Sequence, residues 1–206
     1  MAGIESESGV IATYMVMINS PLYDIKSRQS RGTLKLLLCG GHEIGLHFDF
    51  DGAHRLEAPS MDATEQKIDS ACQRLEDILG ASVKSVSFHR PLERFLRGPS
   101  TVAGRVNAYS KELMDWYLSD SRGNWREGEP LPKLNNPEKK LLQLLIHPIW
   151  WSDHHVAPED RLEEFFEKSI KGLKPEAAKV FDAALASHLT IQRRGYANVE
   201  LAKPAA

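Results

Sequence analysis

Cysteine, long apolar runs and an excess of charge of one sign are all scarce in this sequence. Cys39 and Cys72 are the only cysteines among 206 residues, and their apolar flanks predict two free thiols packed in the core, as in a reducing compartment. The longest apolar run, residues 10–18, is too short to span a bilayer, and no charged leader precedes it. A net charge of −2 argues against binding to nucleic acid or to anionic membranes. These features favour a cytoplasmic protein.

What is present suffices for one sizeable core. Hydrophobic residues make up 42% of the chain, and a chain of this length is expected to fold as a single domain over residues 1–206. Apolar segments of β character alternate with segments of helical period. Strands are expected at 10–18, 43–48, 83–88 and 141–146, and helices at 28–39, 62–79 and, in two parts, 158–193. Such alternation predicts an α/β fold with a mainly parallel sheet.

Local signals refine these elements. The run at 10–18 lacks strict alternation, as expected of a strand buried on both faces. Asp62 and Glu65 have the spacing of a capping box at the start of a helix that Gly80 ends. Further segments are expected to form the tail of a helix (2–8), loops (92–108 and 120–139) and a strand or helix (113–118).

Three histidines lie at the carboxyl ends of predicted strands. His47, His89 and His147 are three of only eight histidines in the chain. In parallel α/β sheets the functional groups gather at this edge, because loops that follow the strands open there. The three imidazoles are therefore the first candidates for a site.

The segment 41–51 favours a metal site of a particular kind. A zincin needs two histidines four positions apart on a helix, whereas His42 and His47 are five apart and Gly45 disfavours a helix. In a strand, His47, Asp49 and Asp51 would point to the same side. One imidazole with one or two carboxylates suits Zn²⁺, Mn²⁺, Fe²⁺ or Co²⁺. Alternatively, the aspartates begin a turn and His47 is a hydrogen-bonded core residue.

Two further strand ends carry reactive groups. His89 is a candidate ligand and Arg90 a candidate partner for a carboxylate through two hydrogen bonds, unless the pair simply forms a turn with a surface ion pair. His147 precedes Trp150 and Trp151, and an imidazole in a partly dry pocket can act as general acid or base. The two indoles would stack on a sugar ring or pack in the core.

The segment 117–126 is polar and carries one large aromatic residue. Asp120, Arg122 and Trp125 either line a substrate groove or belong to a solvated loop that Trp125 anchors. The sequence favours neither alternative.

Taken together, these segments resemble the polysaccharide-deacetylase superfamily (carbohydrate esterase family 4, the NodB-homology domain), and in particular a bacterial branch of it. Residues 41–47, GHEIGLH, are similar to the second family motif, which ends on a metal-binding histidine. Residues 88–91, 117–125 and 145–147 look like variants of the third, fourth and fifth motifs, in the family order. The resemblance covers a motif-bearing core at residues 9–151.

The resemblance implies a fold, a reaction and a set of roles. The fold is a distorted (β/α) barrel, and the reaction is metal-dependent hydrolysis that removes an N-acyl group, typically acetyl, from an amino sugar or glycoconjugate. The expected ion is a divalent metal, zinc in the first instance. By matching motifs, the implied residues are His47, Asp51, Asp49 and His89 for the metal, His147 as general acid, Arg90 to position the aspartate base, and Asp120, Arg122, Trp125 and Trp150 for substrate.

The sequence departs from the family pattern at two places. The second metal histidine of the family corresponds here to Asp51, with Asp49 as a nearer substitute. The family also opens with a strand that carries its catalytic aspartates, and the residues before position 9 contain no such strand. Three explanations are expected: the protein begins further upstream, the chain is truncated, or it is a degenerate member of the family. Two other hypotheses therefore stand beside the hydrolase. One is an inactive or truncated deacetylase-like domain that binds a carbohydrate or protein partner, and the other is an α/β interaction protein with structural histidines.

A barrel without its first strand is expected to form a homodimer or to aggregate, because two exposed strand edges invite pairing with another chain. Light scattering on the purified protein at high concentration measures this directly. A mass above that of one 23.1 kDa chain is expected, and a clean monomer would contradict the expectation.

Overall fold

The computed structural model of this chain describes residues 1–50, 60–89, 91–113, 116–134 and 141–169. The chain divides into two compact units. The first comprises Met1–Tyr117 with Pro137–Gln143, and the second comprises Leu118–Asn136 with Leu144–Ala206.

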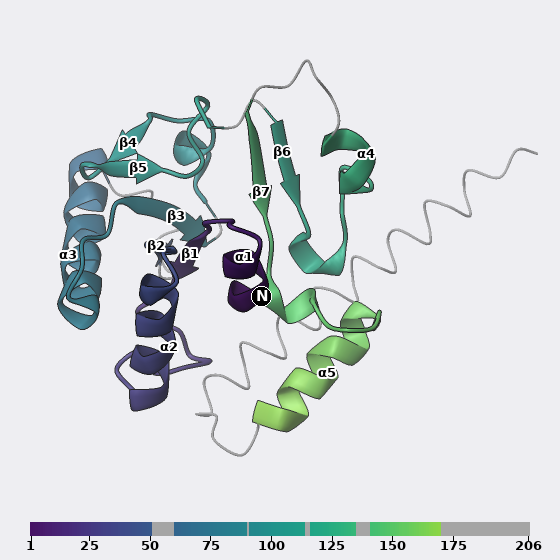
Figure 1. Cartoon of the computed structure of the whole chain (residues 1–206). Coiled ribbons are helices and arrows are strands. Elements are labelled where there is room, and N and C mark those ends of the chain that lie inside the picture. Colours follow the sequence, from purple (N-terminus) through teal and green to yellow (C-terminus); the bar gives the residue numbers. More distant parts are fainter. Residues whose placement is uncertain (51–59, 90, 114–115, 135–140, 170–206) are drawn as a thin grey trace, which may run out of the picture. The chain divides into compact units, whose positions relative to one another are not determined.

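Helices and strands alternate through the first unit (Figure 1). In chain order they are α1 (Ala2–Glu7), β1 (Thr13–Val16), α2 (Arg28–Cys39), β2 (Glu43–Asp49), α3 (Met61–Leu79), β3 (Ser85–His89), the 3-10 turn η2 (Glu93–Phe95), β4 (Thr101–Val102) and β5 (Arg105–Asn107). The helix expected at 28–39 is confirmed, and so is the helical tail expected at 2–8.

Six further elements follow along the described chain. They are β6 (Trp116–Ser119), η3 (Ser121–Gly123), α4 (Pro130–Leu134), β7 (Leu142–Leu145), η4 (Pro148–Trp150) and α5 (Pro158–Ser169). β6 and β7 pair with each other as a two-stranded sheet. The segment 113–118, for which the sequence allows a strand or a helix, thus contributes a strand. The second of the two helices expected within 158–193 lies outside the described residues.

The five-stranded sheet has the order β1-β2-β3-β5-β4. β1, β2, β3 and β5 are parallel, and β4 runs antiparallel at one edge. The expected α/β class with a parallel-rich sheet is confirmed. Within the described residues the sheet is open and does not close into a barrel, so the deacetylase-type barrel stays a prediction.

The two faces of β2 differ in chemistry, because successive side chains of a strand point to opposite sides. Ile44 and Leu46 are buried, and their neighbours on β3, Val86 and Phe88, are at most 1% exposed. This apolar face packs against α2 and α3, whose Leu34, Leu37, Ile68, Cys72 and Leu75 complete the core. Burying one such side chain contributes about 1.5–3 kcal/mol, which makes this layer the main source of stability in the unit.

The start of α3 differs from the expected capping box. Ser60 is the N-cap, and its hydroxyl accepts a hydrogen bond from the Ala63 amide at 3.2 Å. Asp62 lies in the first turn, where its charge still favours the positive end of the helix dipole. Gly80 ends the helix with a left-handed φ of +67°, as expected of glycine at this place.

Three other expectations are corrected. The strand buried on both faces that is expected at 10–18 is corrected to the shorter β1, none of whose residues is fully buried, and Ile11 before it is 73% exposed. β1 lies at one edge of the described sheet. The loop expected at 92–108 contains η2, β4 and β5. These are held by Asn107, whose buried amide donates to the carbonyls of Phe95 and Pro99. The loop expected at 120–139 contains η3 and α4 in its described part.

The two cysteines are free, as expected, but only one packs in the core. Cys72 is fully buried on α3, whereas Cys39 is exposed at the end of α2. Burial raises the pKa of the Cys72 thiol to about 11, although nearby Arg105 opposes the shift. Cys72 is therefore a neutral packing residue at physiological pH.

α1 is fastened to the sheet by polar contacts. Tyr14 of β1 donates a hydrogen bond to Glu5 at 2.5 Å, and desolvation together with this bond raises the pKa of Tyr14 to about 12. The buried His42 accepts from the Ala12 amide through Nδ1, so its Nε2 carries the proton and donates to Ser6. His42 is thus engaged on both ring nitrogens.

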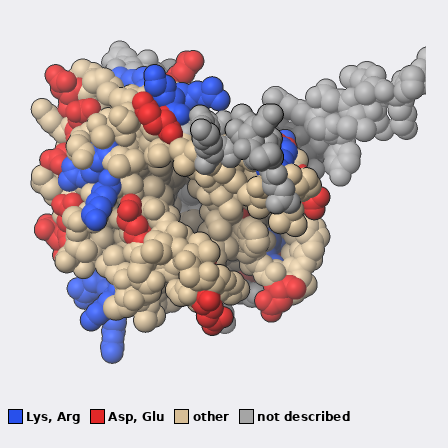
Figure 2. Space-filling model, turned by 45° about the horizontal axis from the view of Figure 1, so that its top comes forward, with Lys and Arg blue, Asp and Glu red and all other residues tan. Residues whose placement is uncertain are grey.

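Charged side chains of both signs are spread over the face drawn in Figure 2. The chain carries 26 basic and 28 acidic residues. None of the described helices is long and apolar enough to cross a membrane.

Close packing at Gly45 generates a stability prediction. A Cβ on Gly45 would lie 2.5 Å from Met15 Sδ and 2.6 Å from Ser85 Oγ, and Ser85 is held by a hydrogen bond to Glu43. We expect Gly45→Ala to lower the free energy of unfolding by about 1–3 kcal/mol, as overpacking does. Urea denaturation followed by circular dichroism measures the change.

Gly32→Ala is the matched control, since Gly32 lies within α2 and nothing is within 4 Å of its added Cβ. This change is expected to leave stability unchanged or to raise it by up to about 1 kcal/mol, because alanine favours helix. Equal effects of the two substitutions would contradict the packing argument.

Candidate functional site

The face of the sheet opposite the helices is polar. On β2 it presents Glu43, Gly45, His47 and Asp49, and on β3 it presents Ser85, Ser87 and His89. Two hydrogen bonds connect the strands on this face: Ser85 donates to Glu43 at 2.5 Å, and His47 Nδ1 lies 2.6 Å from Ser87 Oγ. The hydroxyls, imidazoles and carboxylates of this face can form hydrogen bonds to a polar ligand, and such bonds offset the cost of removing these groups from water.

His47 and His89 come together at the carboxyl end of this face. Their rings meet edge to face with centroids 5.6 Å apart, and the register places Asp49 directly opposite His89. Both imidazoles are half-buried, and Asp49 is exposed. Three of the four residues predicted to bind metal thus end the two neighbouring central strands.

The other predicted residues of this group lie outside the described residues, namely Asp51 and Arg90. Among the described residues no three His, Cys, Asp or Glu side chains converge tightly enough to hold a metal ion. In kind, however, the imidazoles of His47 and His89 with the carboxylate of Asp49 match the nitrogen and oxygen donors that zinc takes.

Ser87 is a residue that the sequence analysis missed. It is 6% exposed and lies two residues before His89 on the same face of β3. Its hydroxyl fixes the ring of His47 by binding Nδ1, which is how the partners of metal-binding histidines orient them. The sequence did contain a signal for Ser87. It lies two residues before the candidate His89 in a predicted strand, and residues at this spacing share one face of a strand.

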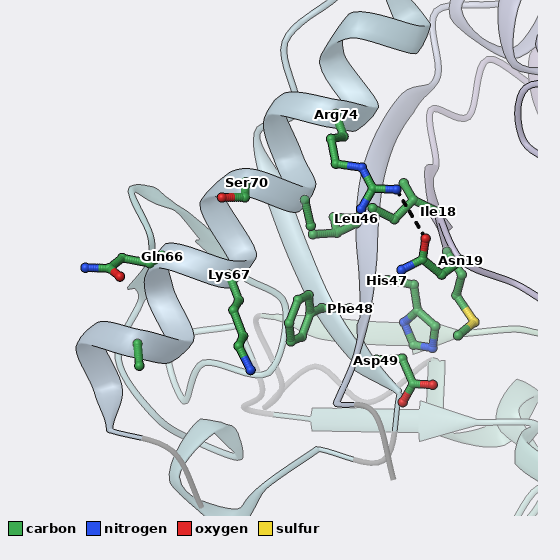
Figure 3. Close-up of a pocket in the computed structure, with 13 residues that line it drawn as sticks. Ile18, Asn19, Leu46, His47, Phe48, Asp49, Gln66, Lys67, Ser70 and Arg74 are labelled. Atoms are coloured by element: carbon green, nitrogen blue, oxygen red, sulfur yellow. Dashed lines mark hydrogen bonds between the residues drawn. The ribbon is translucent and has the colours of Figure 1, made fainter. Parts of the chain in front are cut away.

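A pocket of about 500 Å³ adjoins the site. It lies where the carboxyl end of β2 meets α3 and the segment that follows β1 (Figure 3). His47 and Asp49 line it from the strand, Asn19 from the segment after β1, and Lys67 and Arg74 from α3. Its volume is within the range of small-molecule sites.

The second unit contains a different constellation, centred on Asp120. This carboxylate is 4% exposed. It accepts hydrogen bonds from Nδ1 of His147 at 2.7 Å, from the His147 amide at 2.9 and 3.0 Å, and from Nε1 of Trp151 at 2.8 Å. A buried carboxylate is stable only with such a set of donors.

The contact with Asp120 gives His147 a defined state. Because Nδ1–H donates to the carboxylate, Nε2 is the ring atom that takes up or releases a proton. The side chain of His147 is 43% exposed, so a ligand can reach it. This carboxylate–histidine pair has the geometry of an oriented general acid or base.

The residues predicted to bind substrate differ in burial and in their contacts. Asp120 is buried and engaged by protein donors, and it positions His147. Arg122 is exposed and adopts a left-handed φ of +65° in η3. Trp125 and Trp150 are half-buried. Trp151, for which the sequence allows stacking on a sugar or packing in the core, is 52% exposed and donates to Asp120 through its indole N–H.

The histidines expected at one sheet edge belong to different units. His47 and His89 belong to the first unit and His147 to the second. The group at His47 and His89 and the group at Asp120 and His147 are therefore described separately, each by the contacts within its own unit.

Comparison with protein-family models finds no match for this chain, and comparison with curated proteins finds none either.

Removal of the Asp120 carboxylate is expected to destabilise the second unit. Asp120→Ala would leave the His147 amide and Trp151 Nε1 without an acceptor, and a buried unsatisfied donor costs about 1–3 kcal/mol. Urea denaturation monitored by tryptophan fluorescence measures the loss. Asp153→Ala is the control, because Asp153 is exposed and such changes stay within about 0.5 kcal/mol. Equal stability of the two variants would contradict the role given to Asp120.

Proposed function

We propose that this chain is a metal-dependent hydrolase of the polysaccharide-deacetylase type, which removes an N-acyl group from an amino sugar or glycoconjugate. The observation that carries the proposal is the pairing of His47 with His89 beside Asp49, on the polar face of a parallel sheet and at its carboxyl end. The order of the motifs in the sequence supports the same assignment.

The residues of the first unit would hold the ion. His47 and His89 supply nitrogen donors and Asp49 an oxygen donor, with Ser87 fixing the ring of His47. Zinc, the proposed ion, polarises a carbonyl group and lowers the pKa of a bound water when it is present in such sites. The polar face around it offers hydrogen bonds to the acyl group and the sugar hydroxyls.

His147 would protonate the leaving amine. Asp120 keeps Nδ1 protonated and directs Nε2 outward, so a second proton taken up at Nε2 is available for transfer. General acid or base catalysis of this kind contributes roughly 10²–10⁴-fold in rate.

A second candidate is a deacetylase-like domain that binds a carbohydrate or protein partner without turnover. It is favoured by one observation, namely that no three metal donors converge among the described residues. The pocket beside His47 would then serve recognition alone.

Metal content separates the two candidates. Protein purified without chelator or affinity tag is expected to contain about one equivalent of zinc or a similar ion by elemental analysis, since a His/Asp site binds one ion. His47→Ala should lose it. His155→Ala should keep it, because His155 is an exposed residue of the segment before α5.

Acetate release from N-acetylglucosamine oligomers completes the test. The metal-loaded protein should release acetate, and His147→Gln should retain the metal while losing roughly 10²-fold or more in rate. Absence of metal from both the wild type and the His155→Ala control would overturn the proposal of a metal-dependent hydrolase. Oligomer binding without acetate release would then establish the second candidate.

A further inference from the structure

One face of α3 lines the pocket with small, polar and basic side chains. They recur at helical spacing as Ala63, Gln66, Lys67, Ser70, Ala71 and Arg74. The adjacent stripe of the same helix, Thr64, Ile68, Cys72 and Leu75, is buried in the core. A sheet-covering helix normally keeps an apolar stripe next to the sheet and charges on its far side. On α3, by contrast, Lys67 and Arg74 lie next to the buried stripe and line the pocket.

Cations outnumber carboxylates among the described residues that line the pocket. Lys67 and Arg74 are the cations, and Asp49 is the carboxylate. Two acidic residues of α3 are engaged elsewhere, since Asp69 and Glu76 lie 2.6 and 3.7 Å from the guanidinium of Arg105. This balance among the described side chains favours an anion.

Arg74 has unused capacity to bind it. Its only hydrogen bond to a described side chain goes from Nη2 to Asn19 Oδ1 at 3.3 Å, a neutral acceptor at long distance (Figure 3). A guanidinium carries five N–H groups in a planar fork that matches the two oxygens of a carboxylate or phosphate. The contact with Asn19 holds the side chain across the pocket, ready for such a group.

The shape of the pocket suits an elongated ligand. Arg74 lies eleven positions after Ala63, which corresponds to roughly 16 Å along the helix axis. Leu46 and Phe48 project from β2 toward α3, whereas His47 and Asp49 project from the other side of the strand (Figure 3). A ligand can thus rest its apolar surface on Phe48 and place one end near His47.

We infer that this pocket binds a small molecule bearing an oxyanion, either a carboxylate or a phosphate, that Arg74 and Lys67 hold. Binding of the oxyanion is inferred from the pocket alone. Its assignment to the substrate rests on the proposed function and makes that substrate an acidic N-acylated sugar, with the oxyanion at Arg74 and the remainder extending toward His47.

Calorimetric titration of the full chain tests the inference with three probes that share one sugar. N-acetylglucosamine 6-phosphate carries a phosphate, N-acetylmuramate carries a carboxylate, and N-acetylglucosamine is neutral. At least one acidic probe is expected to bind about tenfold or more tightly than the neutral sugar, since a charge-assisted hydrogen bond is worth about that factor. Which acidic probe binds more tightly identifies the oxyanion.

Arg74→Gln should remove this preference, and Lys67→Gln should reduce it. Arg31→Gln is the matched control, because Arg31 is likewise an exposed helical arginine but lies on α2 and outside the pocket. The preference should also fall as salt rises from low to physiological strength, because the pocket is open to solvent.

Equal affinity for the acidic and neutral sugars would overturn the inference. So would equal effects of Arg74→Gln and Arg31→Gln, or no binding of either acidic probe up to about 10 mM. The proposed function is judged separately, by metal content and acetate release. If an acidic probe binds in a way that depends on Arg74 but no acetate is released, the oxyanion site is supported. The claim that this oxyanion belongs to the substrate is then wrong.

Discussion

Pairing of β2 with parallel neighbours on both sides is the constraint that separates the apolar core of the first unit from its polar face. Since β1 and β3 fix its backbone, each side chain of β2 must point either to the helices or away from them. Ile44 and Leu46 take the helical side and are buried there. A shift of register by one residue would exchange the two faces and place Glu43 and His47 in the apolar core, at a prohibitive cost in desolvation.

The polar face depends on this arrangement and supports itself with cross-strand bonds. Glu43 pairs with Ser85 and His47 with Ser87, so its most buried polar groups have partners. Gly45 between them lets Met15 and Ser85 approach closely. The face ends in His47, Asp49 and His89 at the carboxyl ends of the two strands. The gathering of these side chains is therefore a consequence of the same alternation that builds the core.

In the second unit a single carboxylate orients a histidine. Asp120 is buried, and it is tolerated there because the His147 side chain and amide and the Trp151 indole all donate to it. It fixes the segment after β7 and, at the same time, the orientation of His147. Gly123 is packed against Pro158, where a Cβ would lie within 2.6 Å. This contact brings the start of α5 against η3.

Local features of the chain follow from the sequence itself. Helical spacing and a terminal glycine predict α2 and α3 closely, and strand alternation alone places His47 and Asp49 on one side of β2. These features depend on neighbours within a few residues. The N-cap at Ser60 was missed because Asp62 offers an equally good local pattern, and the β4–β5 hairpin was missed because its strands are too short for a period. Tertiary structure alone decided that Ser87 holds His47 across 40 residues of sequence and that Asp120 holds His147 across 27. Such partners are selected by the folded arrangement of strands and loops, because many serines and aspartates in the chain are chemically equivalent until the fold brings one of them within reach.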